Sequence, residues 1–217
     1  MVFEKKTEHR KRHDIFVTYL GGPGKSGSWV ANQFRAVNQI VKTNLIEFST
    51  VVKIAEKNQV VFDDMKVLII ADDFACTGNS LCEYLEINKN SLSTMATEFN
   101  VRILLFVAFG FEDALDSIIK KIEDLNLKVD VHFGKQFGEE ERIFSGKSRY
   151  FSSEDKKRDM EVILVEHFGH KVDKSRPKGY NDSEVAIVFP EKCPNNSLPV
   201  FWKSKADWTP LFRRIVG

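Results

Sequence analysis

The chain has few cysteines and no closely spaced pair of them. Its three cysteines, Cys76, Cys82 and Cys193, form no C-x-x-C motif, and their odd number leaves one over. Disulfide scaffolds and structural zinc sites depend on paired cysteines at short spacing. We therefore expect neither of them, and we expect the protein to work in a reducing compartment.

An excess of charge of either sign is also lacking. The sequence has 32 Lys and Arg residues against 31 Asp and Glu residues, so no overall field attracts it to nucleic acid or to anionic lipid. One basic cluster, in residues 5–12, is interpreted as a solvated N-terminal segment. Nucleic acid is therefore not indicated as a partner.

Long hydrophobic runs are absent as well. The most apolar stretch, residues 101–111, contains Arg102 and is shorter than the roughly 20 residues that a membrane-spanning helix needs. The charged N-terminus lacks the apolar core of a signal peptide. We expect a cytoplasmic protein with no membrane partner. No internal repeat or low-complexity tract is present either.

Strand-like and helix-like segments alternate along the first two thirds of the chain. Such alternation predicts an α/β fold with a doubly wound, mostly parallel sheet. The predicted strands are residues 15–20, 66–71, 101–109 and 128–133. The predicted helices are residues 29–41, 80–87 and 112–125, with residues 43–64 irregular apart from one short helix.

The last third of the chain is less regular. A helix is predicted over residues 153–169, capped by Ser153 and closed by Gly169, and a strand over residues 184–189. The tail, residues 193–214, is too aromatic to be disordered. We predict a single domain of residues 1–217, with a core over about residues 14–135 and a hood or packing region over about residues 136–217.

Two adjacent carboxylates, Asp72 and Asp73, follow the apolar run of residues 67–71 and precede a small-residue turn. In open α/β sheets, ligands bind at the carboxyl ends of strands. A turn that leads into a helix presents unpaired N–H groups and the positive end of a helix dipole, which suit a phosphate. The two acids suit ribose hydroxyls or a hydrated Mg²⁺. The alternative is an ordinary loop whose aspartates cap the next helix.

A second glycine-rich turn lies between the first predicted strand and helix, in residues 21–28. Its Gly24, Lys25 and Ser26 match the end of a Walker A motif, but Tyr19 stands where that motif needs its first glycine. Because the match is partial, a P-loop nucleoside triphosphatase is the second-ranked alternative. In either case the lysine and the neighbouring amides and hydroxyls suit a pyrophosphate.

The stretch from Val67 to Ser80 resembles the phosphoribosyl-pyrophosphate (PRPP) motif of type I phosphoribosyltransferases. The resemblance implies that Asp72 and Asp73 hold the ribose hydroxyls and Mg²⁺, directly or through water. It assigns the ribose and 5′-phosphate to Asp72, Asp73, Ala75, Cys76, Thr77, Gly78, Asn79 and Ser80. It assigns the pyrophosphate to Gly24, Lys25, Ser26, Gly27 and Ser28, with Asp72, Asp73 and Lys25 as the catalytic residues.

Other segments extend the resemblance over most of the chain. Gly22 to Gly27, Phe34-Arg35 and the stretches 194–199 and 208–213 resemble a divergent branch of phosphoribosyltransferase-like proteins in bacterial conflict and antiphage systems, some of them retron-associated. This resemblance implies an effector role in defence, a protein partner, and either a monomer or a homo-oligomer. Cys76 stands where several purine-specific members carry a third acid. A PRPP-consuming transferase and a non-catalytic PRPP or nucleotide sensor therefore both stay open.

Two further groups of side chains have alternative interpretations. Asn195, Asn196 and Trp202 either form a hood over an acceptor base or anchor the tail in the core. His132, near the end of a predicted strand, either borders the acceptor pocket or is a satisfied strand histidine.

Overall fold

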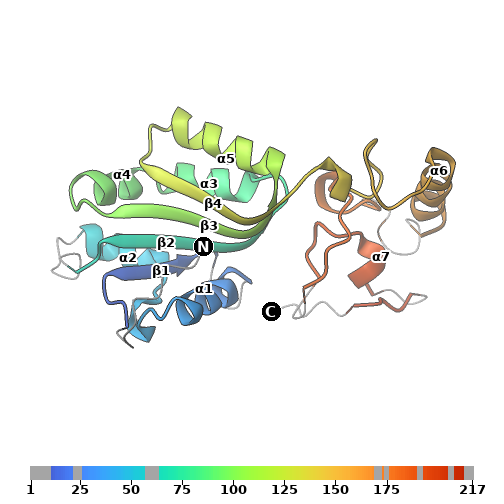
Figure 1. Ribbon diagram of the computed structural model, residues 1–217. Coiled ribbons are helices and arrows are strands. Elements are labelled where there is room, and N and C mark those ends of the chain that lie inside the picture. The colour runs from blue at the N-terminus through green and yellow to red at the C-terminus, as the bar shows by residue number, and fades with distance from the viewer. Residues whose placement is uncertain are drawn as a thin grey trace. The chain divides into compact units, whose positions relative to one another are not determined.

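The computed structural model describes residues 11–21, 26–56, 64–168, 173, 176–189, 193–204 and 208–212 (Figure 1). The chain divides into two units, Met1–Gln136 and Phe137–Gly217. Each unit is described here by itself.

A four-stranded sheet forms the centre of the first unit. Its strands stand in sequence order, β1 (Ile15–Tyr19), β2 (Val67–Ala75), β3 (Arg102–Phe111) and β4 (Val129–Phe137). β1 pairs in parallel with β2 and β2 with β3, so that Ile15 lies opposite Val67 and Val67 opposite Arg102. A helix separates each strand from the next, as parallel pairing requires. The expected α/β fold with a parallel sheet is confirmed.

Part of the outer edge of β1 is covered by its own chain. Isolated parallel bridges join Arg12 to Ile40 and Val17 to Leu45, on either side of the short 3-10 helix η1 (Lys42–Asn44). Val41 N donates to Arg12 O at 3.2 Å, and Ile46 N donates to Val17 O at 3.0 Å. β1 remains the edge strand of the four-stranded sheet, with its outer edge covered near Val17.

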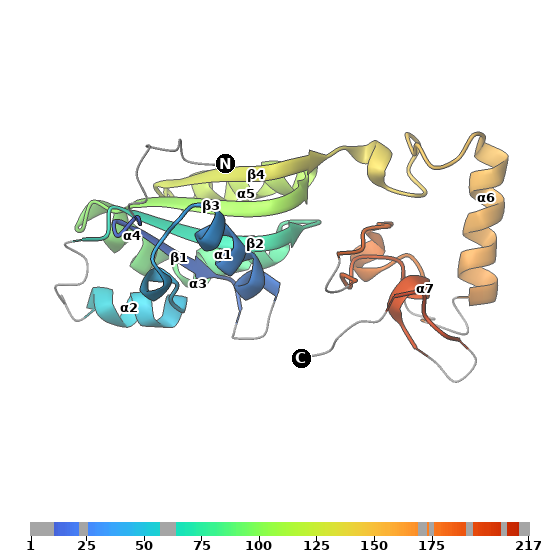
Figure 2. The same ribbon diagram turned by 60° about the horizontal axis from the view of Figure 1, so that its bottom comes forward.

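Helices cover both faces of the sheet (Figures 1 and 2). α1 (Ser26–Val37) packs on one face, where its Val30, Ala31 and Phe34 join alternate residues of the strands in one buried cluster. The other face carries α2 (Phe48–Glu56), α3 (Asn79–Ile87), α4 (Lys89–Thr97) and α5 (Glu112–Asp124). In α5 the buried residues Ala114, Ile118 and Ile122 recur at the helical spacing of four. The sheet is therefore wound on both faces, as expected.

Several element boundaries differ from those predicted. β2 continues to Ala75 and β4 to Phe137, and α1 occupies residues 26–37 rather than 29–41. α4 was not predicted, because its sequence is rich in Asn, Ser and Thr, which are poor helix formers. It forms because Leu92 and Met95, three positions apart, are both buried.

Two buried hydroxyl groups have no hydrogen-bond partner among the residues that the structure describes. They are Thr18 Oγ1 in β1 and Tyr84 OH in α3. The Tyr84 ring packs against Phe48 of α2, with 5.1 Å between ring centroids. Burial raises the pKa of Tyr84 above its ordinary value.

We expect Tyr84→Phe to raise the free energy of unfolding by about 1 kcal/mol, because it removes a buried polar group and keeps the ring. Urea denaturation measures the change. Tyr150→Phe is the matched control, since Tyr150 OH donates to Glu141 Oε2 at 3.1 Å, and it should give no gain. A loss of stability in Tyr84→Phe would show that this hydroxyl is satisfied in solution.

The second unit contains short helices around a small core. The N-cap of α6 (Glu154–Val162) is Ser153, whose side chain accepts a hydrogen bond from Lys156 N. The helix continues as the π-helix η4 (Ile163–Phe168). The predicted cap at Ser153 is confirmed, whereas Gly169 lies outside the described residues. The remaining helices are η3 (Glu139–Glu141), η5 (Tyr180–Asp182) and α7 (Pro199–Trp202). The core consists of Ile143, Phe144, Leu164 and Leu198.

The strand predicted over residues 184–189 does not form. Only Val185 makes bridges, to Arg142 and to Ser197. Glu184 has a positive φ of 55°, which is incompatible with an extended strand at that residue. In the described part of the whole chain, no helix is both long enough and apolar enough to cross a membrane.

Candidate functional site

The sheet topology brings two loops together at one edge. The loop after β1 leads into α1 on one face, and the loop after β2 leads into α3 on the other face. Because β1 and β2 are parallel neighbours, both loops leave the same edge of the sheet. Ligands of open α/β sheets bind where neighbouring connections diverge in this way. The two glycine-containing loops singled out in the sequence therefore adjoin at the expected place.

β2 extends beyond the end of β1. The last pair of the two strands is Tyr19 with Ala71, whereas β2 still pairs with β3 at Asp72 and Ala75. The prediction that the strand ends before the two acids is therefore wrong. Successive side chains of a strand face opposite sides of the sheet. The side chains of Asp72 and Asp73 therefore lie on different faces of β2, beyond the last residue of β1. Both side chains are half-buried.

The loop after β2 leads directly into the amino end of α3. Gly78 precedes the helix with φ of 75° and makes no side-chain cap, and the first turn contains no acidic residue. Asn79 N makes a long contact with Thr77 Oγ1, at 3.5 Å. The positive end of this helix dipole suits an anion. Ser80 and Asn79 are exposed, whereas Cys76 is buried.

Gly78 is also a packing residue. A Cβ built on it would lie 2.9 Å from Ala114 O and 3.1 Å from Ile118 Cγ1, both on α5. Glycine is needed there for its left-handed backbone and for the close approach of α5. The sequence motif gave no sign of this contact, because α5 comes more than thirty residues later.

The loop after β1 is described at its two ends. Gly21 has φ of 78°, Ser26 opens α1, and Gly27 is buried. The predicted residues Gly24 and Lys25 lie outside the described part of the chain. A Cβ built on Gly27 would lie 3.4 Å from Asp72 Oδ1. The structure thus places Gly27, in the first turn of α1, next to Asp72 of β2.

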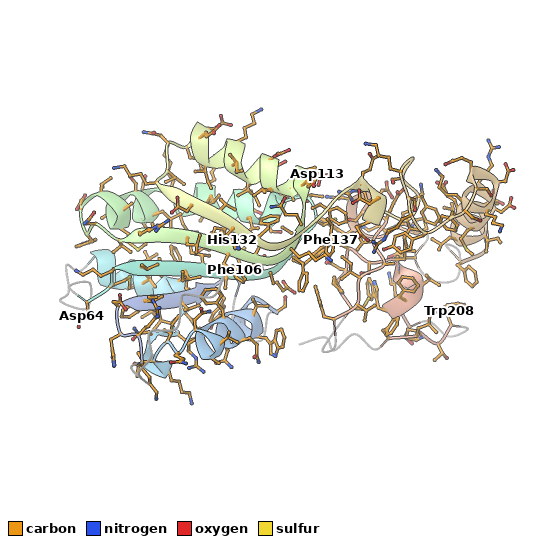
Figure 3. All side chains as sticks on the ribbon, viewed as in Figure 1. Asp64, Phe106, Asp113, His132, Phe137 and Trp208 are labelled. Carbon is orange, nitrogen blue, oxygen red and sulfur yellow. The ribbon has the colours of Figure 1, made fainter. Side chains whose placement is uncertain are left out.

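His132 belongs to a row of rings on the sheet (Figure 3). Its ring stacks on Phe106 with 6.1 Å between centroids and 18° between planes, and Phe106 contacts Phe34 of α1 at 4.8 Å. Burial lowers the pKa of His132 below its usual value. These contacts are those of a packed strand histidine.

The tail residues are held within the second unit. Trp202 Nε1 donates to Ser197 O at 3.0 Å, and Asn196 Nδ2 donates to Ser183 Oγ at 3.2 Å. Both contacts favour the anchoring interpretation for Asn196 and Trp202. Asn195 contributes its carbonyl oxygen to Tyr180 N at 3.3 Å.

A resident metal site is not evident. No group of three or more His, Cys, Asp and Glu side chains gathers closely enough to bind a metal in the parts of the chain that the structure describes. Mg²⁺ bound together with a phosphate ligand needs only one or two protein carboxylates and keeps several waters. Asp72 and Asp73, both half-buried at the end of β2, fit this second kind of binding.

A family model described as PRTase-CE matches residues 2–214, almost the whole chain. No curated protein matches the sequence.

Proposed function

Because the chain belongs to the PRTase-CE family, which is phosphoribosyltransferase-like, we propose that it binds PRPP with Mg²⁺ across the loops that follow β1 and β2. The observation that supports this most is the proximity of Gly27, in the helix turn that follows the first loop, to Asp72, in the strand that precedes the second loop. One ligand with a phosphate at each end of a ribose matches two neighbouring phosphate-type loops.

Each part of PRPP has its own set of residues in this proposal. Asp72 and Asp73 bind the ribose hydroxyls from the two faces of β2, beyond the last residue of β1, and residues 75–80 bind the 5′-phosphate at the amino end of α3. Residues 24–28 bind the pyrophosphate, with Lys25 as the point charge. Mg²⁺ adds positive charge beside the pyrophosphate.

As a transferase, the protein would displace pyrophosphate from the anomeric carbon of PRPP. The acceptor atom forms a bond to that carbon, the bond from the carbon to the pyrophosphate oxygen breaks, and pyrophosphate leaves with the electron pair. Positive charge grows on the ribose and negative charge on the pyrophosphate. Carboxylates at the ribose and N–H groups at the phosphates stabilise both changes. Anchoring at the 5′ end holds the ribose in a productive position.

Cys76 favours a second candidate function, a non-catalytic sensor of PRPP or a nucleotide. It occupies the position where the resemblance places an acid that acts on the acceptor base, and it is only 4% exposed. A buried thiol does not replace an acid that must reach a substrate. The proposed role in bacterial defence applies to the transferase and to the sensor alike.

Calorimetry with Mg²⁺ and either PRPP or ATP tests the proposed ligand. We expect the wild type to prefer PRPP, and Lys25→Ala to weaken that binding. Preferential binding of ATP that is lost in Lys25→Ala would instead establish the P-loop alternative. Release of pyrophosphate from PRPP in the presence of candidate acceptors then distinguishes a transferase from a sensor. A sensor binds PRPP but releases no pyrophosphate from it.

A further inference from the structure

Gly27 lies against the ends of β1 and β2. It is the second residue of α1, and a Cβ built on it would lie 3.0 Å from Leu20 O, 3.4 Å from Ala71 O and 3.4 Å from Asp72 Oδ1. We call these three atoms the Gly27 seat. Gly27 is not among the glycines with positive φ. Glycine is therefore favoured here for space and not for backbone conformation, because an added Cβ would be tight against Leu20 O.

The Gly27 seat joins the start of the first loop to β2. Leu20 directly follows β1, Ala71 and Asp72 belong to β2, and Leu20 N donates to Ala71 O at 3.4 Å at the end of the ladder between β1 and β2. Two of the three seat atoms are carbonyl oxygens next to paired strands. They cannot move away from an added methyl group without disturbing that pairing. The position of the amino end of α1 is thus set by the end of the ladder between β1 and β2.

The charge of Asp72 fits this arrangement. Its Oδ1 lies beside the first turn of α1, which contains no acidic residue of its own. The positive end of a helix dipole favours a carboxylate at this position. Asp72 therefore has a neighbour in the first turn of α1 in addition to its proposed contact with the ribose.

We propose that Gly27 is a positioning residue, which keeps the first turn of α1 at the correct distance from Asp72 of β2, so that one ligand can reach both. This inference rests on the proposed function and deepens it. In the proposed complex PRPP contacts both the first turn of α1, through its pyrophosphate, and Asp72 of β2, through its ribose, so its affinity depends on their spacing. Ribose 5-phosphate has no pyrophosphate to contact α1, so its affinity does not.

The test compares the affinities of PRPP and ribose 5-phosphate in Gly27→Ala, by calorimetry with Mg²⁺. We expect PRPP to bind at least about tenfold more weakly, while the affinity for ribose 5-phosphate stays within about twofold. Gly146→Ala is the matched control, because a Cβ built on Gly146 meets nothing within 4 Å. It should change neither affinity. Thermal unfolding confirms that each variant is folded.

Asp72→Asn provides a second variant if Gly27→Ala does not fold, since it keeps the volume of the seat and removes the charge. The affinities for PRPP and for ribose 5-phosphate should both fall, because the ribose loses a contact. The affinity for PRPP should fall further. An equal loss for the two ligands would show that Asp72 acts on the ribose alone.

The outcomes separate this inference from the proposed function. A wild-type protein that binds neither PRPP nor ribose 5-phosphate overturns the proposed function. A wild-type protein that binds both, with the ratio of the two affinities unchanged in Gly27→Ala and in Asp72→Asn, overturns the positioning role alone.

Discussion

Asp73→Asn is expected to lower the affinity for PRPP in the presence of Mg²⁺ by about 10- to 100-fold. The substitution keeps the shape of the side chain and removes a carboxylate that accepts hydrogen bonds from ribose hydroxyls in the proposed complex. Hydrogen bonds to charged groups contribute about 1.5–3 kcal/mol each, and about 1.4 kcal/mol corresponds to a factor of ten. Calorimetry measures the affinity, and release of pyrophosphate measures any turnover.

Asp64→Asn is the matched control for this prediction. Asp64 is an exposed aspartate that precedes β2, at the opposite end of the strand from Asp73 (Figure 3). It should leave the affinity for PRPP unchanged. If Asp73→Asn binds PRPP as tightly as the wild type, the ribose is not held by this carboxylate, and the assignment of the loop after β2 is wrong.

Gly78→Ala is expected to lower the free energy of unfolding by about 3 kcal/mol. A left-handed backbone costs a residue with a Cβ about 1–2 kcal/mol, and an overpacked contact costs about 1–3 kcal/mol. Both apply, because Gly78 has φ of 75° and the added carbon would lie 2.9 Å from Ala114 O. Urea denaturation, followed by circular dichroism, measures the loss.

The control for Gly78→Ala is again Gly146→Ala, which should change stability by less than about 0.5 kcal/mol. Gly146 makes no close contact at its Cβ position, and its φ is not positive. A loss of less than about 1 kcal/mol in Gly78→Ala would show that α5 moves aside easily. The contact between Gly78 and α5 would then not determine the shape of the loop.

The sequence predicted the elements whose pattern is local. The apolar runs of β1, β2 and β3 were recognised because strands buried on both faces need continuous Val, Ile and Leu residues. α5 was recognised from apolar residues at the spacing of one helix face, and α6 from its serine cap. Both glycine loops were found because a strand, a small-residue turn and a helix follow one another directly.

Features that depend on distant contacts were missed. The sequence could not show that β3 supports β2 as far as Ala75, since that pairing joins residues 35 positions apart. α4 has weak helix formers and is held by burial of Leu92 and Met95. The Gly27 seat was also invisible, because Leu20, Gly27 and Asp72 meet only once the strands pair. The assignment of the site residues to a ligand remains a prediction.

Pairing on both sides of β2 affects how often the proposed ligand site opens. β2 is hydrogen-bonded to β1 on one side and to β3 on the other, and it carries Asp72 and Asp73 near its carboxyl end. Amide protons of such interior strands are among the slowest in a domain to exchange with solvent. We therefore expect slow exchange in β2, so that the two acids extend from a strand that rarely opens.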